Sequence, residues 1–142
     1  MLTKHKVVVG TIGADAHMIG GWVLSKYLTE AGFDVTFLGA VVSQEEFVKT
    51  AVETGAEAIM VSSMYGMGLL DCEGLRQKCI EAGIKDVILY AGGTVSATGE
   101  LQTNWPEIER RFEEMGFERV FPNTVKPEEV ITSLKAHLRI ND

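Results

Sequence analysis

The chain has 142 residues, of which 46% are hydrophobic and 23% charged, and its formal net charge at pH 7 is -7. This length and composition predict one globular domain, spanning residues 1–142, that can bury a hydrophobic core. The acidic balance and the lack of a basic run argue against a nucleic-acid partner. The sequence shows no leader pattern and no apolar run of membrane-spanning length. We therefore expect a cytoplasmic protein without a membrane partner.

Short apolar runs alternate with segments of helical spacing along the whole sequence. The apolar runs predict five β-strands, at residues 6–10, 34–38, 58–61, 87–90 and 119–121. The helical segments predict five helices, at about residues 20–31, 43–55, 69–82, 104–116 and 127–138. Because each strand is followed by a helix, right-handed crossovers would give a parallel sheet with helices on both faces. The predicted fold is an α/β, doubly wound sheet of the flavodoxin-like or Rossmann-like type, with strand order 2-1-3-4-5.

Local signals mark several predicted helix ends. Ser43 and Glu46 form a capping box, in which each side chain accepts a hydrogen bond from the other residue's backbone N–H. Asn104 is a cap for the fourth helix, whose first turn contains Pro106. Gly32 follows the first helix, where glycine commonly ends a helix.

The two cysteines, Cys72 and Cys79, both fall in the third predicted helix. Two helical turns separate them by about 10 Å along the helix axis, which is too far for a disulfide. Their spacing also differs from the C-x-x-C motif of zinc and thioredoxin-like sites. We expect two buried or half-buried thiols.

The loop between the first strand and the first helix contains Asp15, His17 and Gly20. In open parallel sheets, ligands bind at such strand-to-helix loops. A histidine close to a carboxylate is typical of a metal-ligating imidazole, which donates its second ring N–H to an acid. A plain helix cap by Asp15 explains the same residues, and this loop alone leaves both interpretations open.

Two further loops are predicted to meet this one, because strands one, three and four are neighbours in the predicted order. Ser62 and Ser63 follow strand three, and Gly92 and Gly93 follow strand four. The hydroxyl groups can bond a polar ligand, and the glycines let a ligand approach the backbone closely. A serine cap and a glycine turn are the simpler alternatives, but three such loops at one edge favour a binding site.

Several common uses of this site do not match the sequence. No Walker lysine and no G-x-G-x-x-G motif are present. Ser62 stands where a receiver domain would have its phosphoacceptor aspartate. His5 and His137 are predicted to lie far from His17, so a free metal ion would lack the three or four protein ligands that it needs. A macrocycle that brings its own equatorial ligands, haem or corrinoid, remains.

Three motifs in the sequence resemble the pattern D-x-H-x-x-G … S-x-L … G-G of cobalamin-binding domains. They are Asp15 to Gly20, Ser62-Ser63-Met64 and Gly92-Gly93. Met64 replaces the usual leucine, which is nearly isosteric with it. The resemblance covers the whole chain and is greatest to the small cobalamin-binding subunit of glutamate mutase (methylaspartate mutase). Residues 61–66, 74–79, 104–106 and 115–117 resemble that subunit beyond the three motifs.

The resemblance implies adenosylcobalamin as the cofactor, with its own benzimidazole displaced from the cobalt. His17 would be the lower axial cobalt ligand, and Asp15 would orient it. The detached nucleotide tail would enter a slot between the first helix and the sheet, and Ser62 would bond the displaced base. The full implied set of cofactor-binding residues is Ala14, Asp15, Ala16, His17, Met18, Gly20, Ser62, Ser63, Met64, Gly92, Gly93, Thr94, Val95 and Ser96.

The resemblance also implies an enzyme, an isomerase that interconverts L-glutamate and threo-3-methylaspartate by a radical mechanism. All five arginines are predicted to lie away from the site loops, so L-glutamate would bind to a larger, barrel-type partner subunit. A corrinoid carrier for methyl transfer and the cobalamin subunit of another acyl or amino mutase are the alternatives. Without cofactor, we expect the slot to close or the start of the first helix to melt.

Overall fold

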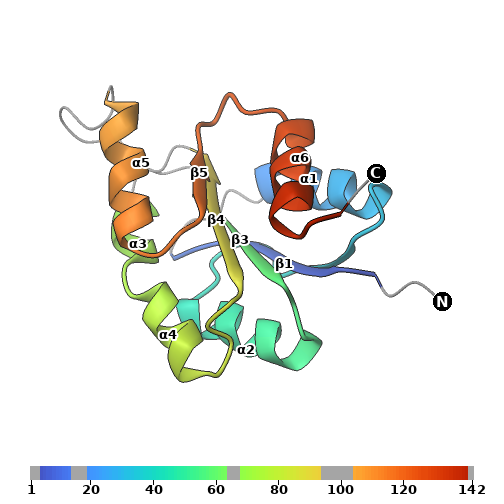
Figure 1. The fold of residues 1–142 in the computed structure, drawn as a ribbon, viewed down its shortest axis with the longest axis horizontal. Coiled ribbons are helices and arrows are strands. Elements are labelled where there is room, and N and C mark those ends of the chain that lie inside the picture. The colour runs from blue at the N-terminus through green and yellow to red at the C-terminus, as the bar shows by residue number, and fades with distance from the viewer. Residues whose placement is uncertain (1–3, 14–18, 64–67, 94–103, 141–142) are drawn as a thin grey trace.

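The computed structural model describes residues 4–13, 19–63, 68–93 and 104–140, and these form one five-stranded parallel sheet with helices on both faces (Figure 1). The strands are β1 (Lys6–Thr11), β2 (Asp34–Phe37), β3 (Ala58–Ser63), β4 (Ile88–Gly93) and β5 (Arg119–Phe121). The helices are α1 (Ile19–Glu30), α2 (Gln44–Thr54), α3 (Gly68–Cys72), α4 (Leu75–Glu81), α5 (Trp105–Glu114) and α6 (Pro127–His137). The strand order is β2-β1-β3-β4-β5, which confirms the predicted topology.

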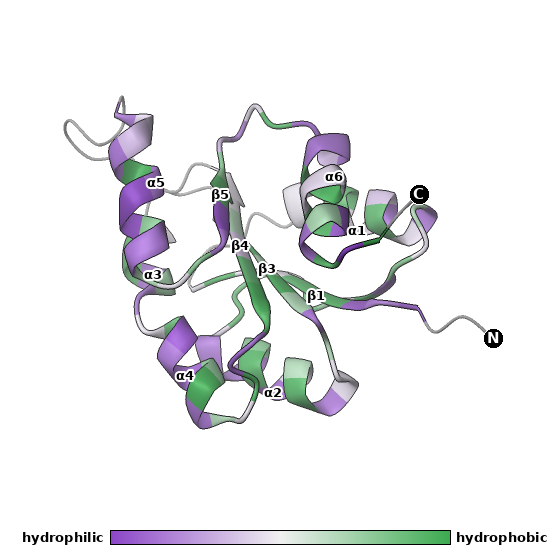
Figure 2. Ribbon diagram, in the orientation of Figure 1, coloured by the Kyte–Doolittle hydropathy of each residue, from purple (hydrophilic) through white to green (hydrophobic). Residues whose placement is uncertain are grey.

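The two faces of the sheet carry separate hydrophobic clusters. One face packs against α2, α3, α4 and α5, and the other packs against α1 and α6 (Figure 1). Side chains alternate along each strand, so Val8 and Ile59 belong to the first cluster, whereas Val9 and Met60 belong to the second. Figure 2 shows the central strands in hydrophobic green and much of α4 and α5 in hydrophilic purple. This distribution is what a parallel sheet buried on both faces requires.

The predicted helix ends are present in the structure. Ser43 Oγ accepts a hydrogen bond from the Glu46 N–H at 3.1 Å, and Asn104 Oδ1 accepts one from the Glu107 N–H at 3.3 Å. The helix α2 ends at Gly55, which adopts a left-handed backbone conformation. None of the helices in the described part of the chain is long and apolar enough to span a membrane.

The third predicted helix is interrupted, and its prediction as one continuous element over residues 69–82 was wrong. Gly74 has a φ of 87°, which an α-helix cannot accommodate, and it separates α3 from α4. Cys72 therefore ends α3, and Cys79 lies in α4. Both thiols are free and buried, as predicted, and burial raises the pKa of both.

A partly buried arginine, Arg76, stabilises the structure where β4 and β5 begin. Arg76 donates hydrogen bonds to the carbonyl oxygens of Gly116 (2.9 Å) and Val87 (2.8 Å) and to the carboxylate of Glu118 (2.8 Å). Glu118 in turn accepts a bond from the Leu89 N–H at 2.8 Å. Gly116 has a φ of 91°, and a Cβ there would lie only 2.7 Å from Arg76 Cγ, so no other residue fits this position. The arginine is therefore structural and lies at the edge opposite the candidate site.

Candidate cofactor-binding site

The carboxyl ends of β1, β3 and β4 meet at one edge of the sheet, as the sequence predicts. In the strand register, Thr11 pairs with Ser62, and Ser62 pairs with Gly92. Residues at or next to the carboxyl ends of three neighbouring strands therefore lie in one row across the sheet. This row places Ser62 and Gly92 side by side at the point where the chain turns into the loops that follow β1, β3 and β4.

A cavity of about 200 Å³ opens at this edge, on the face of the sheet that α1 and α6 cover. Four predicted site residues line it, namely Gly20, Ser62, Gly92 and Gly93. The other lining residues are Val9, Gly21, Leu24, Met60, Val61, Tyr90, Phe121, Pro122, Asn123, Val125, Pro127 and Val130. The cavity thus lies between the first helix and the sheet, where the resemblance implies a slot for the nucleotide tail.

Glycine residues keep the mouth of this cavity open. Among the described residues, a Cβ at Gly20 would meet only Ser62 Oγ, at 3.9 Å, and a Cβ at Gly92 would meet only Phe121, at 3.6 and 3.8 Å. Both positions have room for a side chain, which would project into the cavity. Gly21 differs because its Cβ would approach the Phe37 ring to 3.3 Å, so this glycine allows α1 to pack closely on the sheet.

The two serines at the end of β3 lie on opposite faces of the sheet, because successive strand residues alternate. Ser62 is half-buried and lines the cavity. Ser63 is only 1% exposed, and its hydroxyl has no hydrogen-bond partner within the described part of the chain. A buried hydroxyl without a partner costs about 1–3 kcal/mol. Because its side chain lies on the other face of the sheet, Ser63 does not line the cavity. Its role in cofactor binding stays a prediction.

The inner wall of the cavity is aromatic and was not anticipated from the sequence. Tyr90 is buried, and its ring packs edge-on against Phe121 with centroids 5.3 Å apart. The Tyr90 hydroxyl shares a hydrogen bond of 2.9 Å with Ser133 Oγ and also bonds His137 Nδ1, and both partners belong to α6. Burial raises the pKa of Tyr90, so the phenol stays neutral. The guanidinium of Arg119 lies 4.5 Å from the centre of the Phe121 ring.

This wall combines residues that are distant in the sequence. Met60 and Ser62, and likewise Tyr90 and Gly92, are alternate residues of one strand, so the period-two pattern of β3 and β4 contained a signal for them. Val130 comes from α6, and no sequence signal placed that helix beside the cavity.

Nine predicted site residues lie outside the described residues. They are Ala14, Asp15, Ala16, His17, Met18, Met64, Thr94, Val95 and Ser96. The segments that contain them continue directly from Gly13, Ser63 and Gly93, the last described residues after β1, β3 and β4. The assignment of His17 as a cobalt ligand and of Asp15 as its partner therefore stays a prediction.

The described side chains fit one part of a cobalamin. The cavity is mainly apolar, has aromatic rings on its inner wall, and holds Ser62 at its mouth. Such a site suits an aromatic heterocycle that needs few hydrogen bonds. Among the described residues, no group of three or more His, Cys, Asp or Glu side chains could hold a free metal ion. His5 instead bonds Glu57 at 2.7 Å, and His137 bonds Tyr90.

Comparison with known proteins identifies the family of this chain. Residues 5–115 match the B12 binding domain family. The glutamate mutase sigma subunit of Carboxydothermus hydrogenoformans is 53% identical over 137 residues, which cover 96% of this chain and 98% of that protein. The sigma subunit of Fusobacterium nucleatum is 44% identical over 98% of this chain and 100% of that protein. The chain belongs to the B12-binding family, among the glutamate mutase sigma subunits. The resemblance inferred from the three motifs is confirmed.

Solved structures place this B12-binding domain within a broadly shared fold. A cobalamin-binding protein from Desulfitobacterium hafniense superposes with a TM-score of 0.74 at 18% identity, over 94% of this chain and 59% of that chain. A two-component response regulator from Aurantimonas superposes with a TM-score of 0.64 at 12% identity, over 96% of this chain and 86% of that chain. Because both kinds of protein share the fold, the fold alone does not assign a function.

Proposed function

We propose that this chain is the cobalamin-binding subunit of an adenosylcobalamin-dependent glutamate mutase. The observation that carries the proposal is the 53% identity to a glutamate mutase sigma subunit over almost the full length of both chains. The cavity supports it independently, because an apolar slot bordered by Gly20, Ser62 and Gly92 fits the nucleotide tail of a cobalamin. The enzyme is then an isomerase with two components, of which this chain is one.

In the proposed mechanism, this chain binds and orients the cofactor. His17 would ligate the cobalt, and Asp15 would accept the other ring N–H of His17, which would select the tautomer and raise the basicity of the ligating nitrogen. Ser62 would bond the base of the nucleotide tail, while Tyr90 and Phe121 form the inner wall of the slot and would exclude water. When bound, adenosylcobalamin supplies the cobalt–carbon bond whose homolysis starts the radical rearrangement of L-glutamate to threo-3-methylaspartate.

The substrate is proposed to bind to a larger, barrel-type mutase subunit. Arginine is the residue best suited to hold the two carboxylates of L-glutamate. Arg76 is occupied by Glu118 and backbone carbonyls, and Arg110 is paired with Glu107 and Glu114. The Arg119 guanidinium packs against the ring of Phe121. None of these arginines lines the cavity, which favours a substrate site on the partner.

Spin-resonance spectroscopy tests the cofactor assignment directly. The chain is reconstituted with cob(II)alamin, once with natural histidine and once with nitrogen-15 histidine. If His17 ligates the cobalt, the superhyperfine splitting changes with the label, because nitrogen-14 and nitrogen-15 have different nuclear spins. The same spectrum from the His17→Gly variant is the control and should lose the histidine coupling. A wild-type spectrum that does not respond to the label would rule out histidine ligation.

A further inference from the structure

Two large apolar side chains protrude from the carboxyl edge of the sheet. Leu70 is 61% exposed and Val41 is 58% exposed, the highest values among the described large hydrophobic residues. Leu70 lies in α3, which follows β3, and Val41 lies in the loop that joins β2 to α2. Both positions follow the carboxyl end of a strand, so they share the edge at which the cofactor cavity opens. Neither side chain contributes to the hydrophobic core.

The segments that carry these two residues are tied together. The side chain of Gln44, three residues after Val41, donates hydrogen bonds to the carbonyl oxygens of Asp71 (2.6 Å) and Glu73 (2.8 Å), just after Leu70. The start of α2 and the end of α3 are thereby held next to each other. Val41 and Leu70 therefore lie on adjacent segments of the same edge, and we call these two exposed side chains the rim patch.

Val41 is held in an unfavourable backbone conformation. Its φ is 58°, in the left-handed region that β-branched residues avoid. The next residue explains how this conformation persists. Val42 is buried, and its backbone forms two hydrogen bonds with the segment at the end of β1. The Val42 N–H donates to the Thr11 carbonyl at 2.9 Å, and the Gly13 N–H donates to the Val42 carbonyl at 2.8 Å. Strain of this kind, maintained by the surrounding structure, is typical of functional positions.

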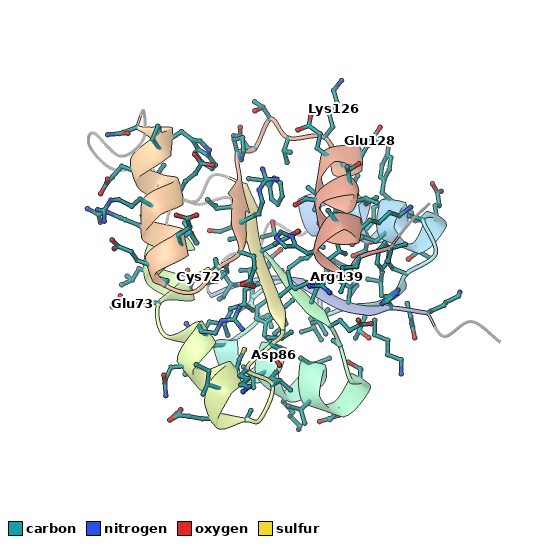
Figure 3. The ribbon with its side chains drawn as sticks, in the orientation of Figure 1. Cys72, Glu73, Asp86, Lys126, Glu128 and Arg139 are labelled. Atoms are coloured by element: carbon teal, nitrogen blue, oxygen red, sulfur yellow. The ribbon has the colours of Figure 1, made fainter. Side chains whose placement is uncertain are left out.

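Exposed acidic residues lie on the segments that carry the rim patch. Glu45 and Glu46 in the first turn of α2 are exposed, and Glu73 lies on the outer side of the turn between α3 and α4 (Figure 3). Lys78 in α4 forms an ion pair with Glu45. A partner that fits this surface has an apolar recess with basic residues at its border.

We propose that Val41 and Leu70 are the anchors through which this chain docks onto the larger subunit of glutamate mutase. The inference rests on the proposed function, because it takes that subunit as the occupant. The larger subunit must approach the cofactor at the carboxyl edge, and the rim patch is continuous with that edge. An exposed apolar pair with acidic neighbours is an arrangement expected at the centre of a protein–protein interface.

The test combines Val41→Asn with Leu70→Ser. Asparagine tolerates the left-handed conformation, so the double variant should fold and should lose only the apolar anchors. Its affinity for the purified larger glutamate mutase subunit, in the presence of adenosylcobalamin, is measured by analytical ultracentrifugation. We expect a dissociation constant that is about tenfold higher or more. Cobalamin binding by the isolated chain, followed by absorbance titration, should stay within about twofold of wild type.

Val52 and Ile80 provide a matched control, because they are also exposed apolar residues, at 47% and 46%. They lie toward the carboxyl ends of α2 and α4, at the opposite edge of the sheet. The double variant Val52→Asn, Ile80→Ser should leave docking unchanged. Equal loss of docking in both double variants, or no loss in either, would overturn the inference. A loss of cobalamin affinity in the rim variant would assign the patch to the corrinoid instead, whereas a wild-type chain that binds no cobalamin would refute the proposed function.

Discussion

The two faces of the central sheet differ in how tightly they are packed, and two glycines, Gly10 of β1 and Gly92 of β4, show the difference. On the face covered by α2, a Cβ at Gly10 would lie 3.1 Å from the Phe47 ring, so the space is completely filled. On the face covered by α1 and α6, a Cβ at Gly92 would meet only Phe121 within the described part of the chain, at 3.6 Å or more, beside a cavity of about 200 Å³. The first glycine makes room for the protein's own side chain, and the second leaves room for a ligand.

The face with the cavity is stabilised at its inner end by polar contacts. Tyr90 is tied to α6 through Ser133 and His137, and Arg119 donates a hydrogen bond to Ser133 at 3.3 Å. The filled face depends instead on apolar packing around Phe47 and Ile59. Stability and cofactor binding should therefore respond separately to substitutions on the two faces.

The largest effect is expected from Phe47→Ala on the filled face. Phe47 is fully buried, and its removal leaves a cavity, so the free energy of unfolding should fall by about 3–5 kcal/mol. Urea denaturation followed by circular dichroism measures this loss. Cobalamin affinity should be unchanged at temperatures where the variant is folded. A parallel loss of affinity would show that the two faces are coupled.

Gly92→Val is the matching change on the cavity face. The side chain would fill the mouth of the cavity, so we expect cobalamin affinity to fall on the order of a hundredfold, as for a blocked pocket with central contacts. Stability should change by less than about 1 kcal/mol, because valine suits a strand and the position is open. Gly10→Ala is the control, with the opposite result expected: a stability loss of about 1–3 kcal/mol from overpacking and unchanged affinity. Gly92→Val with normal affinity would contradict the placement of the cofactor tail.

Hydrogen exchange tests the cavity face without a substitution, by comparing the start of α1 with the central strand β3. Gly20 and Gly21 each lower the helix propensity of the start of α1 by about 1 kcal/mol relative to alanine. Cobalamin at about a hundredfold excess over its dissociation constant should therefore slow exchange across residues 14–24 by up to about a hundredfold. Residues 58–61 in β3 should change little. Equal protection of residues 14–24 with and without cofactor would mean that the site is fully formed in advance.

The smallest effect is expected from Tyr90→Phe, which removes a hydroxyl and keeps the ring. Two hydrogen bonds to α6 are lost, so the free energy of unfolding should fall by about 1–2 kcal/mol. The effect should depend on pH. Burial raises the pKa of Tyr90 above the usual value of about 10 for a tyrosine, so its contribution is complete below about pH 10 and disappears as the pH rises through the folded pKa. The variant should lack this alkaline loss, and identical pH profiles would exclude Tyr90 as its source.

Sequence patterns predicted the secondary structure well wherever the signal was local. The caps at Ser43 and Asn104 are present, and all five strands occur in the predicted order. The break at Gly74 was missed because a single glycine within a helical pattern is compatible with a continuous helix. Only the φ of 87° at this residue distinguishes a helix end from a tolerated glycine.

The sequence by itself determined the family, the topology and the edge of the sheet at which the site lies. The D-x-H-x-x-G, serine and Gly-Gly motifs are short, and each depends only on neighbouring residues. Tertiary structure decided which side chains complete the cavity. Tyr90 bonds Ser133 and His137 across 43 and 47 residues of sequence, and Phe121 and Val130 lie beyond residues 5–115, which match the family. These contacts arise from the packing of α6 on the sheet, which no local pattern encodes, because burial depends on residues brought together only by the fold.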